Sequence, residues 1–320
     1  MTDTALALHR ATVDRRRHAP RREAIAVYAV VLLMAAVATA IIWPSPLTYD
    51  GAALTPVWLF FGVAAVIGML LHQRGMIATG NGIELIAAFM LVSMMTSFTS
   101  AALAWTALPL ADGALRAADA MLGFSWPAMI DAVRGDTGAL TVLSYVYVSL
   151  GPQPFVLIVL LVATRRLDAA WRFVAAWAIA LLLTLAIFPF VPALGNVAAN
   201  HIAWGAIPGI RSPAAWDFPR ALSALRDGHM TMLGDDALGG IIAFPSFHTA
   251  GAVLLGWGFL QLRWIRFPAI LLNLLMIASA LVIGGHYLVD LIAGGLVAGT
   301  AIAISGRLTT PVRTAARSPG

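Results

Sequence analysis

Long apolar runs separated by short polar segments recur along nearly the whole chain. A helix needs about 17–25 mostly apolar residues to cross the roughly 30 Å hydrocarbon core of a bilayer. Eight runs approach or reach that length, and they predict membrane helices at Ile25–Trp43, Leu54–Leu71, Ile83–Leu108, Leu140–Ala163, Phe173–Val191, Phe247–Leu262, Pro268–Ile283 and Tyr287–Ser305. The sixth and seventh runs are the shortest. The pattern therefore predicts an all-α, polytopic transmembrane bundle with eight spans.

Two longer polar segments, at 109–139 and 192–244, interrupt this pattern. Each follows an odd-numbered predicted span, so both fall on the same side of the membrane. The first is acidic and contains glycine, whereas the second contains four prolines and leads directly into the sixth apolar run. A connection as long as the second is more often functional than slack. It is therefore a candidate part of a functional site.

Composition and charge agree with a membrane protein and give it an orientation. The residues are 60% apolar and 11% charged, with a mean hydropathy of +0.87, far outside the range of soluble globular proteins. All 20 basic residues other than histidine are arginine, and fifteen of them lie on the side of the predicted amino terminus. Because cytoplasmic loops retain positive charge, we expect both termini to lie in the cytoplasm. We expect the membrane to be a bacterial inner membrane. The net charge of +5 then reflects topology, and no nucleic-acid partner is expected.

The candidate chemistry lies in two short histidine motifs, PSFHT at 245–249 and HYLVD at 286–290. The predicted topology places both at the outer, extracytoplasmic ends of antiparallel helices, so His248 and His286 are expected at one membrane level. On a helix, His286 and Asp290 share a face, and the carboxylate can accept a hydrogen bond from one imidazole nitrogen. The other nitrogen is then free to act as a nucleophile. Two such histidines are sufficient for phosphoryl transfer without a metal ion.

Small and capping residues accompany the motifs. Ser246 stands where the sixth helix begins and is expected to cap it. Backbone amides at that end would favour a bound phosphate, so Ser246 is a candidate phosphate-binding residue. Gly284 and Gly285 before the second motif, and Gly295 and Gly299 after it, are expected to let neighbouring helices approach closely.

PSFHT and the segment GGHYLVDLIAG at 284–294 together resemble the second and third signature motifs of the type 2 phosphatidic acid phosphatase superfamily. They are most similar to the branch that holds inositol phosphorylceramide synthases and sphingomyelin synthases, in which the third motif begins directly with histidine and tyrosine. The resemblance covers Leu181–Ala298. It departs from the broader superfamily at three points: Phe247 replaces a glycine, Ser279-Ala280 replace a serine-arginine pair, and the lysine-containing first motif is absent.

The resemblance implies a lipid phosphate phosphatase or phosphotransferase, with a lipid phosphate or phospholipid as substrate and membrane lipids as partners. It implies that His286, oriented by Asp290, attacks phosphorus and forms a phosphohistidine. His248 then protonates the leaving alcohol. No metal and no other cofactor is implied. The acceptor can be water or a lipid or polyol hydroxyl, so the phosphatase and the transferase remain alternatives.

The missing first motif leaves open which residue holds the phosphate. Arginine supplies the best geometry for this task, and only five arginines lie on the outer side. Arg226, in LRDG upstream of PSFHT, is similar to what is expected of bacterial members of this branch. Arg211 and Arg220 are further candidates. The alternative for all three is surface pairing with an acid such as Asp217.

These observations divide the chain into four predicted parts. They are a basic cytoplasmic arm at 1–24, membrane helices and an outer loop at 25–180, a catalytic phosphatase-like core at 181–306, and a cytoplasmic tail at 307–320. A different class of function is a non-catalytic transporter or lipid-binding protein that retains the fold. A transporter typically carries ionisable residues at mid-membrane depth. The predicted helices here are nearly uncharged away from the outer face, which favours the enzyme.

Overall fold

The structure, a computed structural model, describes residues 22–106, 108–234 and 240–309. Among these residues, the helices long and apolar enough to cross a membrane are α2 (Arg22–Ile42), α3 (Gly51–Gln73), α4 (Ile77–Thr106), α9 (Leu167–Ile187) and α14 (Leu288–Thr309). A bent pair of shorter helices can supply a sixth span. The predicted helical membrane protein is thus confirmed, while the count of eight spans and the location of the termini stay predictions. Most of the predicted arm and tail lies outside the described residues.

The fourth predicted span, Leu140–Ala163, is not one straight helix. It consists of α7 (Thr137–Val148) and α8 (Gln153–Ala163), which meet at an angle of 55°. The break falls at Pro152, which follows a glycine. Proline lacks the amide hydrogen that a helix interior requires and disfavours the helical conformation in the residue before it. The bend therefore follows from the local sequence.

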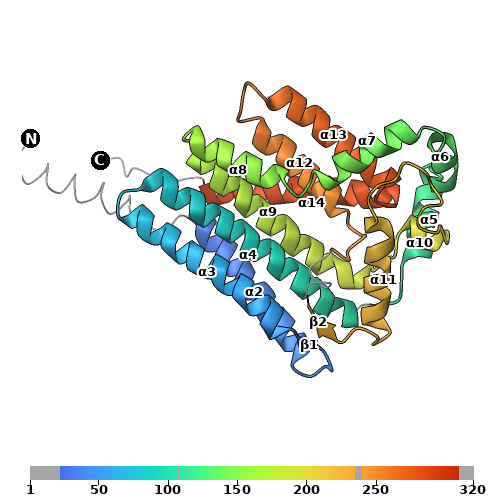
Figure 1. Ribbon diagram of the computed structural model, residues 1–320, viewed down its shortest axis with the longest axis horizontal. Helices are drawn as coiled ribbons and strands as arrows, with labels where there is room; N and C mark the ends of the chain where they lie inside the picture. Colours follow the sequence, from blue (N-terminus) through green and yellow to red (C-terminus); the bar gives the residue numbers. More distant parts are fainter. Residues whose placement is uncertain (1–21, 107, 235–239, 310–320) are drawn as a thin grey trace, which may run out of the picture.

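The sixth and seventh predicted spans correspond to two shorter helices, α12 (Phe247–Phe259) and α13 (Arg266–Val282). They pack against each other, and α12 also packs against α9 and α14. The chain leaves the first histidine motif along α12, returns along α13, and leaves the second motif along α14 (Figure 1). This path brings the two motifs to the same end of the bundle.

Helix α9 forms the centre of the hydrophobic core. Ala175, Ala176, Ala178 and Ala180 are fully buried, although they point in different directions around the helix. A helix that is apolar all round is stable only when neighbours cover every side. Here α2, α4, α12 and α14 surround α9, and Figure 1 shows α9 crossing the middle of the molecule.

The two polar segments predicted as outer loops contain several short helices. The first holds α5 (Asp112–Met121) and α6 (Trp126–Val133), and the second holds α10 (Asn196–Ala199) and α11 (Ala214–Arg226). These helices gather at one end of the bundle, on the right in Figure 1. Because this end also receives both histidine motifs, we call it the histidine end. A short parallel pair joins β1 (Thr48–Tyr49) to β2 (Met232–Leu233).

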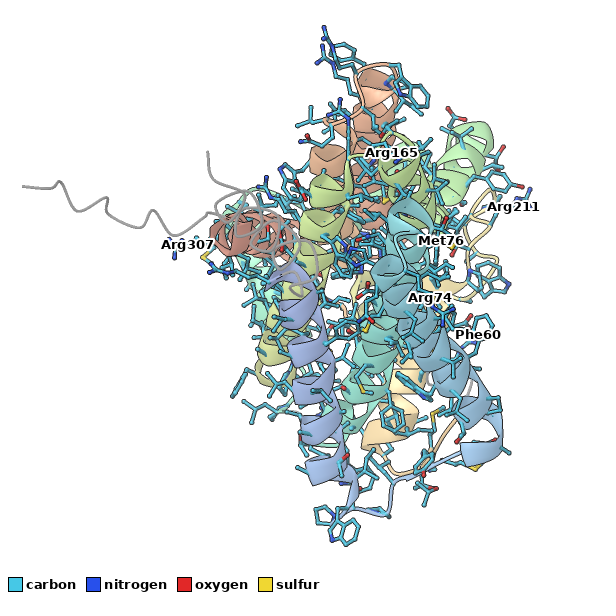
Figure 2. All side chains as sticks on the ribbon, turned by 90° about the vertical axis from the view of Figure 1, so that its left-hand side faces the viewer. Phe60, Arg74, Met76, Arg165, Arg211 and Arg307 are labelled. Carbon is cyan, nitrogen blue, oxygen red and sulfur yellow. The ribbon has the colours of Figure 1, made fainter. Side chains whose placement is uncertain are left out.

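The opposite end of the bundle carries the turns between the membrane helices. Figure 2 looks onto this end, and Arg74, Arg165 and Arg307 lie in the helix ends and turns that face the viewer. Arg166 and Arg263 lie in the connections at the same end, and Arg266 is the first residue of α13 there. We call it the arginine end. That this end faces the cytoplasm stays a prediction from the positive charge of its turns.

Helices α12 and α14 pack closely at Gly294. A Cβ atom added there would overlap the main-chain carbonyl oxygen of Ser246. By contrast, Gly295 and Gly299 have no atom within 4 Å of an added Cβ, so the prediction that they permit close packing is wrong. Successive helical residues are rotated by about 100°, and the contact therefore falls on the neighbouring glycine.

Replacing Gly294 with alanine is expected to destabilise the fold by about 1–3 kcal/mol, because the added methyl group meets backbone that cannot move aside. The measurement is thermal unfolding of the purified protein in detergent. Gly295→Ala is the matched control, since it adds the same methyl group next to open space. We expect the control to leave the melting temperature unchanged or to raise it, because alanine is the better helix former. Equal losses in both variants would contradict this packing.

Candidate active site

The two histidines of the motifs meet at the histidine end. His248 is the second residue of α12, and His286 lies in the turn that leads into α14. Their ring centroids are 6.3 Å apart and their planes are inclined by 55°. The expectation that the histidines lie at one level is confirmed.

His286 is held by Asp290. The Nδ1 atom of His286 lies 3.2 Å from Oδ2 of Asp290, which is fully buried, and the main-chain amide of Tyr287 donates to the same oxygen at 2.9 Å. A carboxylate only accepts hydrogen bonds, so Nδ1 carries the proton and the lone pair lies on Nε2. The predicted contact between His286 and Asp290 is present. The two residues were predicted to lie on one helix, but α14 begins at Leu288, so His286 precedes the helix.

Asp119 of α5 fixes the start of α14. Asp119 accepts hydrogen bonds from the main-chain amides of Leu288 at 2.9 Å and Val289 at 3.0 Å. These amides have no partner within their own helix, so a buried carboxylate stabilises this helix end. Sequence reasoning missed Asp119, although its spacing of seven residues from Asp112 is a signal, because it places both carboxylates on one face of a helix.

Asp112 connects the same helix to the turn before α10. Its carboxylate accepts hydrogen bonds from the amides of Leu194 and Gly195 and from the hydroxyl of Tyr287, the last at 2.9 Å. Burial, and then the neighbouring Asp112, raise the pKa of the Tyr287 phenol above its ordinary range. The phenol therefore stays protonated and keeps donating to Asp112. This contact anchors the residue next to His286.

The main chain around His286 is held from the other side by α10. The amide of Asn196 donates to the carbonyl of Gly285 at 2.6 Å, and the side-chain amide of Asn196 donates to the carbonyl of His286 at 3.0 Å. Gly285 has a φ of +64°, which favours glycine, and an added Cβ would lie 2.8 Å from Val197. The expectation of close packing at Gly285 is confirmed. The position of His286 is thus determined by three separate segments.

His248 is positioned by its own helix start and by Tyr147. The rings of Tyr147 and His248 are stacked, with centroids 3.9 Å apart and an interplanar angle of 11°. Ser246 caps α12, because its hydroxyl accepts from the amide of Thr249 at 3.3 Å, as predicted. The amide of Ser246 donates to the carbonyl of Asp290 at 3.0 Å. The second contact joins the two motifs directly.

A cavity of about 530 Å³ opens beside both imidazoles, and we call it the histidine cavity. Its wall is mostly apolar and comes from α4, the bend between α7 and α8, α9, α11 and the segment 240–243. Three polar atoms of lining residues are buried and have no hydrogen-bond partner within the described structure: Ser93 Oγ, Trp177 Nε1 and Thr184 Oγ1. Buried polar groups are normally paired, so these three are available to a ligand or to water.

The candidate phosphate-binding arginines do not line this cavity. Arg220 pairs with Asp217 at 3.1 Å on the exposed surface, which confirms the alternative interpretation for that residue. The side chain of Arg211 is exposed, while its amide donates to Ser144. Arg226 lies in the last turn of α11. Helix α11 does reach the cavity, but with apolar residues.

Comparisons with known proteins identify one family. A family model described as the PAP2 superfamily, that is, the type 2 phosphatidic acid phosphatases, matches residues 113–304, which is more than half of the chain. The match begins inside α5 and ends inside α14. It therefore includes both histidine motifs and leaves out α2, α3 and α4. No curated protein and no solved structure matches the chain.

Proposed function

This chain belongs to the PAP2 superfamily, and on that premise we propose that it transfers the phosphate group of a membrane lipid through a phosphohistidine intermediate. Membership of the superfamily indicates a phosphatase or phosphotransferase activity of the membrane lipid type, and the apolar helices indicate an integral membrane protein. The observation that carries the proposed mechanism is the arrangement of His286, Asp290 and His248 at the end of one cavity.

In the first half of the proposed reaction, Nε2 of His286 attacks phosphorus and the bond to the ester oxygen breaks. His248 donates a proton to the leaving alkoxide. Asp290 keeps the proton on Nδ1 of His286, so the attacking nitrogen carries its lone pair. In the second half, His248 removes a proton from water or from an acceptor hydroxyl. The oxygen attacks phosphorus, the bond to His286 breaks, and both histidines return to their starting state.

The substrate side of the proposal rests on the histidine cavity. Its apolar wall suits acyl chains, whereas Ser93, Trp177 and Thr184 offer polar atoms that have no partner within the described structure. An ester, amide or hydroxyl group of a lipid could satisfy them. We therefore propose a substrate that combines a phosphate at His286 with a polar linkage and an apolar chain deeper in the bundle.

The charge on the transferring phosphate requires positive groups at the histidine end. We keep Arg226 as the first candidate and Arg211 as a further one, because α11 covers the cavity and carries or adjoins both. The start of α12, next to Ser246, supports the same role, because the first amides of a helix favour a bound phosphate. The histidine end then faces the extracytoplasmic side of a bacterial inner membrane, in keeping with the arginine-rich opposite end.

A lipid panel tests the proposed function. Purified full-length protein in detergent is incubated with phosphatidic acid, phosphatidylinositol and phosphatidylcholine, each with and without ceramide or free inositol, and products are followed by mass spectrometry. Release of inorganic phosphate indicates the phosphatase. A phosphorylated or headgroup-bearing acceptor indicates the transferase and would support the inositol phosphorylceramide synthase-like branch. Turnover of no phosphorylated lipid in the panel would contradict the proposal.

Replacing Thr184 with valine tests the lipid cavity. We expect KM for the preferred lipid to rise about tenfold with little change in kcat, because one hydrogen bond to the substrate is lost. Thermal stability should not fall, since the hydroxyl is unpaired without ligand. The matched control is Thr99→Val, whose hydroxyl is buried but donates to Met95 at 2.7 Å. That control should lose stability and keep KM. A lower melting temperature with unchanged KM in Thr184→Val would contradict the assignment.

A further inference from the structure

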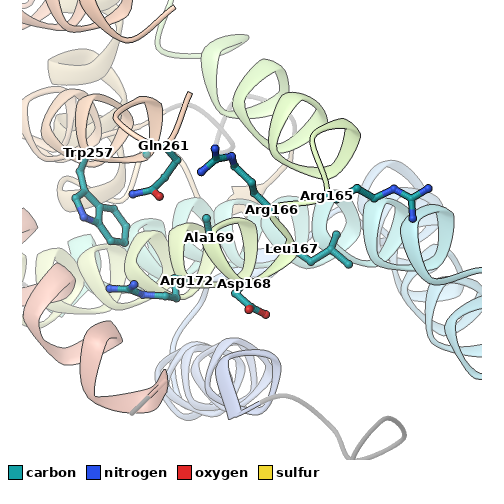
Figure 3. A pocket seen from close by; sticks show the side chains of 9 residues that line it. Arg165, Arg166, Leu167, Asp168, Ala169, Arg172, Trp257 and Gln261 are labelled. Carbon is teal, nitrogen blue, oxygen red and sulfur yellow. The ribbon is translucent and has the colours of Figure 1, made fainter. Parts of the chain in front are cut away.

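A second cavity, of about 480 Å³, lies at the arginine end, far from the histidines along the bundle. It is formed where the turn between α8 and α9 meets the end of α12, and we call it the arginine cavity (Figure 3). Three of its lining residues are arginines: Arg165, Arg166 and Arg172. Lipid phosphatase chemistry at the opposite end does not account for it.

Two of the three arginines point toward the cavity. Figure 3 shows the side chain of Arg166, the residue before α9, reaching toward Gln261, which follows the end of α12. Arg172 lies beside Trp257, with its guanidinium carbon 5.5 Å from the ring centroid. In the same view Arg165 points away from the opening. The interior is therefore framed by two guanidinium groups, one amide and one indole.

Arg172 is the most deeply placed of these cations. Its Nε atom is buried and has no hydrogen-bond partner within the described residues. Its Nη2 atom lies 3.8 Å from where a Cβ would stand at Gly306 of α14, so the side chain is confined between α12 and α14. A buried cation whose donors are not all used is costly unless an anion comes close.

The main chain at the start of α9 adds partial positive charge to that of the arginines. Helix α9 begins at Leu167, next to the cavity, and its N-cap residue Arg166 makes no side-chain capping hydrogen bond. The first amides of a helix carry partial positive charge and favour anions. Asp168 also lines the cavity, and its carboxylate extends toward α2 in Figure 3. The lining therefore carries three arginines against one carboxylate.

We propose that the arginine cavity binds a phosphate-bearing anion, held between Arg166 and Arg172 with Gln261 and Trp257 completing the site. Guanidinium groups match phosphate oxygens with paired hydrogen bonds. The cavity lies among the turns of the basic end, at the level where phospholipid headgroups meet a membrane protein. The phosphate can belong to an anionic phospholipid of that leaflet or to a soluble phosphate ester.

Occupancy of this cavity acts on the same helices that position the histidines. Helix α12 begins with the motif of His248, and α14 carries Asp290 near its start. Arg172 contacts the far halves of both helices. A ligand that binds only the folded protein raises its stability in proportion to occupancy. An anion bound between Arg166 and Arg172 therefore stabilises the packing of α9, α12 and α14.

The experiment measures thermal unfolding of full-length protein in uncharged detergent. The His286→Gln background is used so that turnover at the histidine end cannot consume the ligands. One arm adds phosphatidylglycerol, with phosphatidylcholine as the uncharged reference. The other arm adds glycerol 1-phosphate, with sodium chloride at equal ionic strength as the reference. The test variant is Arg166→Gln with Arg172→Gln, and the control is Arg74→Gln with Arg263→Gln, which removes the same charge from exposed positions at the same end.

We expect the melting temperature to rise by several degrees with a phosphate ligand, a rise that the test variant loses and the control keeps. A rise with glycerol 1-phosphate assigns a soluble ester, whereas a rise with phosphatidylglycerol alone assigns a lipid. If the double variant does not fold, Arg166→Gln alone is used, because Arg166 is exposed. No rise in either arm, an undiminished rise in the test variant, or an equal loss in the control overturns the proposal.

Discussion

Replacing His286 with glutamine is expected to lower phosphate transfer by more than about 10³-fold, because the variant has no nitrogen nucleophile at this position. Glutamine retains a polar side chain beside Asp290, and the carbonyl of residue 286 still accepts from Asn196. The fold should therefore survive. The measurement is the initial rate of product formation from the lipid that the panel identifies, together with the melting temperature of the purified variant.

A labelling experiment separates loss of the nucleophile from loss of binding. Lipid substrate carrying labelled phosphate is mixed with the protein and quenched in alkali, in which phosphohistidine survives. The wild-type protein should carry label that acid releases, and His286→Gln should carry none. His229→Gln serves as the control, because His229 is an exposed histidine of the outer segment. Label on His286→Gln, or full activity of that variant, would assign the nucleophile to another residue.

The second large effect is expected at His248. His248→Gln should lower the rate by about 10²–10⁴-fold for a lipid, whose alkoxide leaving group requires a proton. The loss in the first step should be much smaller for a nitrophenyl phosphate ester, because nitrophenolate leaves without protonation. The second half of the reaction still lacks its base. Phosphorylated enzyme should therefore accumulate in this variant when the nitrophenyl ester is the substrate.

The dependence on the leaving group distinguishes catalysis from packing. Tyr147 stacks on the His248 ring, so a change at His248 could also act through that contact. Tyr147→Phe preserves the stacked ring and should change the rate only slightly for both substrates. Equal losses with the lipid and the nitrophenyl ester in His248→Gln, without accumulation of phosphorylated enzyme, would show that His248 supports the site without transferring a proton.

Sequence reasoning located the two motifs because each is local. His286 and Asp290 are four residues apart, and Ser246 stands directly before the helix that it caps. Such short-range relations follow from backbone geometry alone. The alternation of long apolar runs then placed both motifs at one end, and the distance between the rings of His248 and His286 agrees with that prediction.

Relations between distant residues could not be predicted in the same way. Asp119 caps a helix that begins 169 residues later, and although Leu288 lies in the second motif, Asp119 itself belongs to no recognisable motif. The contact of α12 with α14 falls at Gly294, whereas Gly295 and Gly299 were predicted, because one residue decides which face of a helix meets its neighbour. The outer arginines were chosen as phosphate-binding candidates by their charge alone. One of them, Arg220, pairs with Asp217 away from the cavity.

Helix α4 forms part of the wall of the histidine cavity, and this bears on how substrate preference can change in evolution. Ser93 and the neighbouring lining residues of α4 lie outside the region that matches the superfamily, whereas both histidines lie inside it. The residues proposed to break the phosphate bond and part of the wall proposed to bind the lipid thus occupy separate stretches of sequence. On this proposal, substitutions in α4 change which lipid is accepted, while the histidines of the reaction are inherited unchanged.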